Sequence, residues 1–180
     1  MNEEISKAIE HLNNGGVILY PCDTIWGMGC DATNQTAIDK IYAIKKRKPT
    51  LPLICLLSDF KMAEKYLSIS PKIKSFLNTQ KRPTTVVFDK VKNLETYNKS
   101  IAIRIPNDKF CISLISKFGK PITSTSVNFS GKNYPEYFKD IDQGILNQID
   151  YAVNLRRNEK LKNPSKIVKI KDDSIVTLRE

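Results

Sequence analysis

Three segments of the sequence place polar and charged side chains where packing alone does not require them. The first covers residues 21–29 (PCDTIWGMG) and directly follows the apolar run 17–20, which is typical of a buried strand. Asp23 and Thr24 therefore lie at a strand end, where α/β folds bind ligands, and the glycines allow close approach of the backbone to a ligand. A structural turn around a buried Trp26 is the alternative interpretation.

The second segment is the cationic run at residues 45–48 (KKRK), at the end of a helix that we predict from about residue 34. An arginine guanidinium such as that of Arg47 binds phosphate oxygens in pairs, and a lysine ammonium supplies a point charge. The run is therefore a candidate phosphate clamp. Cations at a helix C-terminus also complement the helix dipole, so a solvated surface patch is the alternative.

The third segment covers residues 124–131 (STSVNFSG) and follows another short predicted strand. Five hydroxyl or amide side chains lie within seven residues, directly before a glycine. Such side chains donate hydrogen bonds to phosphate or carboxylate groups, and they also form capping turns at helix starts. The residues alone leave both interpretations open.

The sequence lacks the motifs on which several common types of enzyme reaction depend. The sequence has neither a GxxxxGK[ST] phosphate loop nor a GxGxxG motif, and its single histidine, His11, lies on the predicted first helix, which argues against a Ser-His-Asp triad. Four cysteines without a CxxC pair argue against a zinc site, and we expect no resident metal. Free thiols fit a reducing cytosol.

Strands and helices alternate along the chain. Apolar spacing predicts a first helix through residue 12 and a last one over residues 138–149, and other helices start near Asn34 and at the caps Ser58 or Asp59, Ser70 and Asp108. Short apolar runs predict strands at residues 17–20, 53–57, 84–88, 101–104, 122–124, 151–153, 165–170 and 174–178. We therefore expect an α/β or α+β fold with a mixed sheet, forming a single domain over residues 1–180.

The charge balance is strongly basic. A net charge of +10 and a pI of about 9.4 favour anionic partners such as nucleotide phosphates or RNA, although a solvated lysine surface explains them equally well. The longest apolar runs are too short to cross a bilayer, and the N-terminal segment lacks the apolar core of a signal peptide. We expect a soluble cytoplasmic protein with no membrane partner.

Taken in order, these segments resemble the threonylcarbamoyl-AMP synthase family, whose domain is called YrdC-like. Residues 21–29 resemble the family's P-T-[DE]-T-x-[YW]-G-L-G pattern, and the residues KxR and SxN of its signature match Lys45 and Arg47, and Ser126 and Asn128. Further matches lie at residues 83–85 (PTT), 102–106 (AIRIP), 163–165 (NPS) and 178–179 (LR). The resemblance extends over nearly the whole chain and is to the short, single-domain form.

The resemblance implies a twisted mixed sheet with flanking helices, curled around a concave basic cavity. It also implies which residues act in that cavity. Catalysis is assigned to Lys45, Arg47, Ser126 and Asn128, ATP binding to Arg47, Ser100, Ser126, Asn128 and Arg179, and threonine binding to Thr24, Arg104 and Ser124.

The enzyme implied by the resemblance is a nucleotidyltransferase. Threonine captures CO₂ from bicarbonate as a carbamate, which attacks the α-phosphorus of ATP and releases pyrophosphate. Mg²⁺ is expected to be held mainly through the ATP phosphates. The product, threonylcarbamoyl-adenylate, supplies the threonylcarbamoyladenosine modification of tRNA, so contacts with tRNA and with downstream transfer proteins are expected.

Several positions depart from the family pattern, and they keep alternatives open. The departures are Cys22 for Thr, Lys48 for Pro, Leu51 for a Lys or Asn beside ATP, Leu56 for a His near threonine, Tyr134 for Ser and Lys166 for Thr. Loss of the polar groups at Leu51 and Leu56 would weaken ligand binding by about 1–2 kcal/mol each.

The main alternative is a divergent paralogue that binds RNA or a nucleotide without this activity, and double-stranded RNA is one expected ligand. A carbamoyl-transferring relative is a third possibility, although that activity belongs to a much longer chain. RNA binding needs aromatic platforms beside basic residues, and most aromatic residues here show core-like spacing. The retained KxR and SxN residues favour the enzyme.

Overall fold

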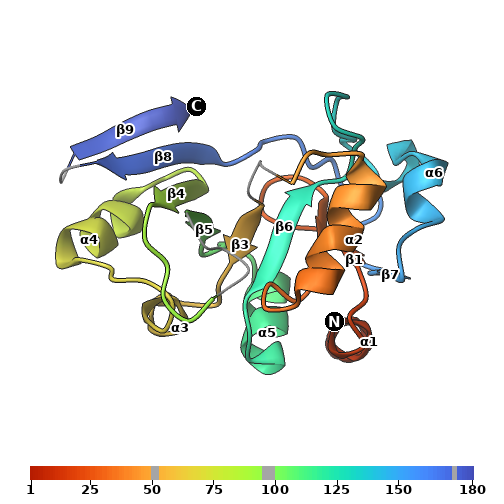
Figure 1. The fold of residues 1–180 in the computed structure, drawn as a ribbon. Helices are drawn as coiled ribbons and strands as arrows, with labels where there is room; N and C mark the ends of the chain where they lie inside the picture. The colour runs from red at the N-terminus through yellow and green to blue at the C-terminus, as the bar shows by residue number, and fades with distance from the viewer. Residues whose placement is uncertain (50–52, 95–99, 172–173) are drawn as a thin grey trace.

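The computed structural model describes residues 1–49, 53–94, 100–171 and 174–180, so that Leu51 lies outside the described residues. The strands are β1 (Ile18–Tyr20), β2 (Gly27–Gly29), β3 (Ile54–Leu56), β4 (Thr84–Phe88), β5 (Ile101–Arg104), β6 (Ile122–Ser126), β7 (Tyr151–Ala152), β8 (Lys166–Lys171) and β9 (Ser174–Arg179). They form one sheet in the order β7-β1-β2-β6-β3-β5-β4-β8-β9, shown in Figure 1.

The sheet is mixed, as the alternation of elements predicted. The pairs β1–β7, β3–β5 and β4–β8 are parallel, and the remaining pairs are antiparallel. Strand β6 lies between β2 and β3 and so joins the two halves of the sheet. The expected fold class is confirmed.

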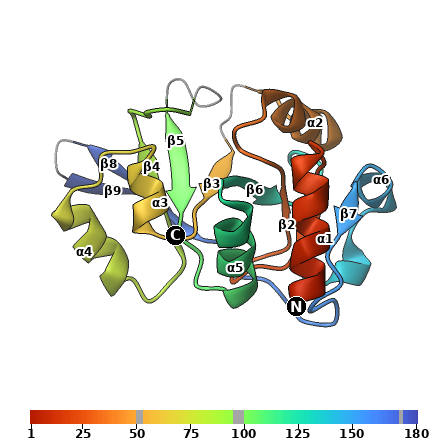
Figure 2. The ribbon, with the colours of Figure 1, turned by 90° about the horizontal axis from the view of Figure 1, so that it is seen from below.

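The helices are α1 (Asn2–Asn13), α2 (Gln35–Lys45), α3 (Phe60–Glu64), α4 (Pro71–Thr79), α5 (Lys109–Phe118) and α6 (Gln143–Leu146), with a 3-10 turn at Phe138–Asp140. Helices α1 and α5 pack against each other, and Figure 2 shows both in front of the central strands. The β8–β9 hairpin lies at the upper left of Figure 1, whereas α1, α3 and α5 lie along the bottom. None of the helices in the described part of the chain is long and apolar enough to cross a membrane.

The predicted caps start these helices. Asn34 caps α2, Asp59 caps α3, Ser70 caps α4 and Asp108 caps α5, each side chain accepting a hydrogen bond from the backbone N–H three residues further on. These bonds satisfy amide groups that have no partner inside the helix. Local sequence therefore determines where the four helices begin.

The predicted last helix over residues 138–149 is wrong in part. Ile141 takes an extended conformation (φ −71°, ψ 131°), which separates the 3-10 turn from α6. Asp142 then starts α6 by accepting a hydrogen bond from the Gly144 N–H at 2.7 Å. Apolar spacing continued across this break and so did not reveal it.

Strand β2 was not predicted, because its sequence is GMG and glycine is depleted in strands. Here the missing side chain has a packing reason. A Cβ added to Gly29 would lie 2.0 Å from the Thr123 carbonyl oxygen on the neighbouring strand. Close approach of β2 to β6 therefore requires glycine at this position.

We predict that Gly29→Ala lowers the free energy of unfolding by about 3 kcal/mol, because the added methyl group meets backbone that cannot move aside. Gly119→Ala is the matched control, since a Cβ there has no heavy atom within 4 Å and only the positive φ of 76° opposes it. Gly119→Ala should lower the free energy of unfolding by about 1 kcal/mol. Urea unfolding of both variants measures the difference, and equal losses would contradict the packing argument.

Candidate active site

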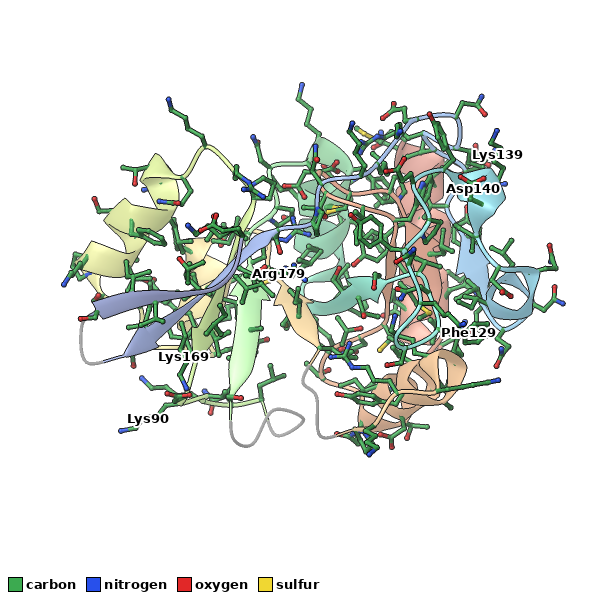
Figure 3. The ribbon with its side chains drawn as sticks, turned by 90° about the horizontal axis from the view of Figure 1, so that it is seen from above. Lys90, Phe129, Lys139, Asp140, Lys169 and Arg179 are labelled. Atoms are coloured by element: carbon green, nitrogen blue, oxygen red, sulfur yellow. The ribbon has the colours of Figure 1, made fainter. Side chains whose placement is uncertain are left out.

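A cavity of about 440 Å³ collects residues from distant parts of the chain. Its walls include residues 24, 25 and 27, Arg47, the start of β3, the end of β6, residues 164, 165 and 167, and Arg179. Six of the nine residues assigned by resemblance line it, namely Thr24, Arg47, Arg104, Ser124, Ser126 and Arg179. Arg179, the last residue of β9, is labelled near the middle of the molecule in Figure 3.

Arg104, the last residue of β5, is the most tightly held of these side chains. It is 3% exposed and forms an ion pair with Asp23. Its Nη2 also donates to Thr24 Oγ1 at 3.3 Å and points to Cys22 Sγ at 3.4 Å. Its buried Nε has no hydrogen-bond partner among the described residues. An unpaired buried donor of this kind is rare, and it belongs to a residue that lines the cavity.

Asp23 couples this arginine to the backbone beyond β5. One carboxylate oxygen faces Arg104, and the other accepts a hydrogen bond from the Asn107 N–H at 2.9 Å. Burial raises the pKa of Asp23, but the Arg104 charge and the hydrogen bonds outweigh it, so that the pKa is lowered from its ordinary value. The carboxylate therefore stabilises the fold fully above about pH 4, and this contribution is lost as the pH falls through the lowered pKa.

We predict that Asp23→Asn lowers the free energy of unfolding by about 3 kcal/mol or more, because it leaves the buried Arg104 charge without its counterion. The double variant Asp23→Asn/Arg104→Met removes both charges and should recover part of the loss. Denaturant unfolding at neutral pH measures both variants. An Asp23→Asn protein as stable as the wild type would show that the ion pair contributes nothing to the free energy of unfolding.

Lys45 lies behind the cavity wall and does not line it. The side chain is 2% exposed, and its ammonium donates to the carbonyl oxygen of Ser126 and, at 2.8 Å, to that of Asn128. A third contact reaches Asn128 Oδ1 at 3.5 Å. The ammonium thus holds the loop after β6, in which Asn128 Nδ2 also donates to the Lys132 carbonyl at 2.6 Å.

Burial, followed by the nearby charge of Arg47, lowers the pKa of Lys45 to about 8. The Coulomb and desolvation effects act in the same direction, because both disfavour the ammonium form. We predict one lysine ¹³Cε resonance that titrates near pH 8 in protein labelled at lysine, and that is missing from Lys45→Met. Titration of every lysine resonance above about pH 10 would contradict the buried position.

The cationic run is divided by the end of α2. Lys46 takes a left-handed conformation (φ 50°) at the helix end and is exposed, with its Nζ 5.1 Å from the centre of the Phe129 ring, a residue labelled in Figure 3. Lys48 is also exposed. Of the run, only Arg47 lines the cavity, so the predicted clamp is one arginine rather than four cations.

Of the other residues singled out in the sequence, Arg179 lines the cavity, whereas Ser100 and Leu56 do not. Arg179 Nη2 donates to the Ser165 carbonyl at 2.7 Å, which holds the guanidinium at the cavity wall. Ser100 directly precedes β5, is half-buried and is not among the cavity-lining residues. Leu56 is fully buried in the core, so it offers no polar group to the site.

Among the cavity residues that sequence reasoning did not assign, Tyr134 and Ser165 have hydroxyl groups in described hydrogen bonds. Tyr134 lines the wall, with its hydroxyl donating to the Lys162 carbonyl at 3.0 Å. Ser165 also lines it, and its hydroxyl lies 2.8 Å from that of Thr85. The matched NPS motif was the available signal for Ser165. Within the described ranges, no cluster of three His, Cys, Asp or Glu side chains is placed to hold a metal ion.

A mixed sheet whose cavity gathers the KxR arginine, the SxN serine and a late arginine defines a YrdC-like domain. Residues 10–180 match the family model of the Sua5, YciO and YrdC proteins, which carries the description "Telomere recombination". The chain therefore belongs to this family.

Curated relatives extend the comparison. A Pseudoalteromonas translucida threonylcarbamoyl-AMP synthase is 32% identical over 158 residues, which cover 83% of this chain and 84% of the relative. A Methanocaldococcus jannaschii protein that carries the same name provisionally is 32% identical over 187 aligned positions. These positions cover 99% of this chain and 87% of the relative.

Solved structures share the fold. P. abyssi Sua5 complexed with L-threonine aligns with a TM-score of 0.82 and 23% identity over 97% of this chain, which spans 53% of the Sua5 chain. E. coli YciO aligns with a TM-score of 0.85 and 21% identity, covering 100% of this chain and 90% of YciO.

Proposed function

We propose that this protein forms threonylcarbamoyl-AMP and pyrophosphate from L-threonine, bicarbonate and ATP, and so supplies tRNA threonylcarbamoyladenosine modification. The observation that carries the proposal is the single cavity lined by Thr24, Arg104 and Ser124 together with Arg47, Ser126 and Arg179. The names of the curated relatives and the threonine complex of Sua5 support it.

Threonine is assigned to the end of the cavity at Arg104. The unpartnered Nε would donate to the substrate carboxylate, since both Nη groups already face the Cys22–Thr24 segment. Thr24 and Ser124 supply hydroxyl groups at the same wall. A polar substrate side chain selected by such groups is discriminated well against an apolar analogue, because the analogue leaves buried polar groups unpaired.

The nucleotide is assigned to the end of the cavity at Arg47, Ser126 and Arg179. Negative charge builds up on the phosphate oxygens as the carbamate attacks the α-phosphorus, and the fixed guanidinium of Arg47 would stabilise that charge. Mg²⁺ carried by the ATP phosphates would supply further positive charge. Lys45 acts through the Ser126–Asn128 loop in this scheme, as a positioning residue.

Holding the carbamate and the α-phosphate in line is expected to supply much of the rate. The backbone geometry of the loop after β6 matters for this reason, because Ser126 must reach the phosphate without rearrangement. No acid-base histidine enters the scheme, since the carbamate is already an anion when it attacks.

A divergent paralogue that binds RNA or a nucleotide is the second candidate. The specific observation in its favour is Leu56, which is fully buried where some family members carry a histidine near threonine. Direct contact with tRNA and delivery to downstream transfer proteins belong to the proposal for the enzyme.

We predict that Arg47→Ala reduces pyrophosphate release at least about a hundredfold, because it removes the guanidinium that faces the phosphates. Lys46→Ala is the matched control, since this neighbouring cation is exposed outside the cavity, and it should retain near-normal turnover. The assay follows pyrophosphate release from ATP and Mg²⁺ with and without L-threonine and bicarbonate.

Two outcomes would overturn these assignments. Near-normal turnover by folded Arg47→Ala would remove the arginine from the reaction. Absence of threonine- and bicarbonate-dependent release from folded wild-type protein would favour the paralogue, and titrations with ATP and with double-stranded RNA would then identify its ligand.

A further inference from the structure

Two buried cysteines face each other beside the proposed threonine end of the cavity. Cys22 follows β1, and Cys111 lies in the first turn of α5. Their sulfur atoms are 3.5 Å apart, with the Cys111 thiol donating toward Cys22. A disulfide bond is about 2.0 Å long, so the two sulfur atoms need to approach by only about 1.5 Å.

The surroundings of Cys22 favour its thiolate. The hydrogen bond from Cys111 lowers the pKa of Cys22, and the Arg104 charge adds to this effect. Together they outweigh burial, the Asp23 charge and the hydrogen bond that the Cys22 thiol donates to Asp23 at 3.0 Å, all of which raise that pKa. Arg104 Nη2 lies 3.4 Å from the Cys22 sulfur. Since the thiolate is the nucleophile in sulfur oxidation, this is the cysteine expected to react first.

A small oxidant has a short path to this sulfur. Asp23 and Arg104, both in contact with Cys22, line a second cavity of about 540 Å³. Thr24 and Arg104 line the active-site cavity. Cys22 therefore lies one side chain away from two cavities, although it is itself 1% exposed.

The other two cysteines are internal controls. Burial raises the pKa of Cys30 to about 12, and burial also raises the pKa of Cys55. Both are 0% exposed and are present mainly as inert thiols at neutral pH.

We propose that Cys22 and Cys111 form an oxidisable dithiol that hydrogen peroxide converts into a disulfide. The Cys22 thiolate attacks one peroxide oxygen and breaks the O–O bond, which gives a sulfenic acid and a hydroxide that takes up a proton. The Cys111 sulfur then attacks the Cys22 sulfur and breaks the S–O bond, and the hydroxyl group leaves as water with the Cys111 proton. Overall, two thiols and one peroxide give one disulfide and two waters.

The bond would change the active site through Arg104. Movement of the Cys22 sulfur toward α5 takes it away from Arg104 Nη2 and pulls on the adjoining Asp23 and Thr24. Oxidation should therefore weaken threonine binding, and this part of the inference rests on the proposed function. Thiol reductants would restore the reduced site.

Cleavage before aspartate separates all four cysteines. It places Cys22 on peptide 1–22, Cys30 on 23–30, Cys55 on 39–58 and Cys111 on 108–139. Native protein is treated with hydrogen peroxide, quenched with catalase, alkylated in denaturant and digested without reductant for mass spectrometry. We expect peptide 1–22 joined to 108–139, at two hydrogen masses below their sum and lost on reduction, with peptides 23–30 and 39–58 alkylated.

Cys111→Ser is the matched variant, because it removes the partner sulfur and leaves Cys22 in place. It should lose the cross-link and accumulate a Cys22 sulfenic acid that dimedone traps. Recovery of peptides 1–22 and 108–139 from oxidised native wild type with both thiols alkylated would overturn the proposal. Equal reaction of Cys30 or Cys55 would overturn the assignment to this pair.

Threonine binding to the same samples tests the coupling. We expect oxidation to raise the threonine Kd at least fivefold in the wild type, reversibly with dithiothreitol. In Cys22→Ser, which can form neither the disulfide nor the Cys22 sulfenic acid, oxidation should leave the Kd unchanged. An unchanged Kd in cross-linked protein would overturn the coupling to Arg104. Absence of threonine binding by the reduced wild type would count against the proposed function. The disulfide assignment would still be decided by the mass spectrometry of the peptides.

Discussion

The ion pair between Arg104 and Asp23 is the interaction on which the cavity depends. Burying either charge alone would cost several kcal/mol, so the pair exists only if both partners and their remaining hydrogen bonds are in place. Asp23 meets this condition by also accepting the Asn107 N–H, and Arg104 by also contacting Thr24. The pair therefore fixes the end of β5 against the segment that follows β1.

Lys45 is a second buried cation, and it holds the segment at the end of β6. The Lys45 ammonium is surrounded by oxygen atoms of the loop after β6, so its charge is satisfied by the protein before any ligand arrives. Fixed charges thus hold the segments around the cavity, and the side chains of Arg47 and Arg104 both line it. A site ordered in this way needs little reorganisation when an anion binds, which is the condition for strong electrostatic stabilisation.

Local patterns predicted much of this structure. The caps at Asn34, Asp59, Ser70 and Asp108 located four helix starts, because a capping side chain acts within three residues of itself. The family motifs gathered six cavity residues from separate segments, although their chemical roles stay predictions.

What local patterns missed was decided by tertiary contacts. The burial of Lys45 depends on a loop 81 residues away, and a charge run at a helix end gives no sign of it. Strand β2 depends on the close approach of Gly29 to Thr123, which opposes the low strand propensity of glycine. The position of Ser100 outside the cavity lining likewise follows from how β5 enters the sheet rather than from its own neighbours.

The parallel pairing of β4 with β8 has a consequence for how the protein folds. It joins segments about 80 residues apart, as the contact between Thr85 and Ser165 illustrates, and it brings the Ser165 wall and Arg179 to the cavity. Contacts of such high sequence separation require closure of a long chain loop, so they form late and slow the search for the native state. The helices and the β1–β2 hairpin can therefore assemble early, whereas a competent ligand cavity appears only with the final collapse of the sheet.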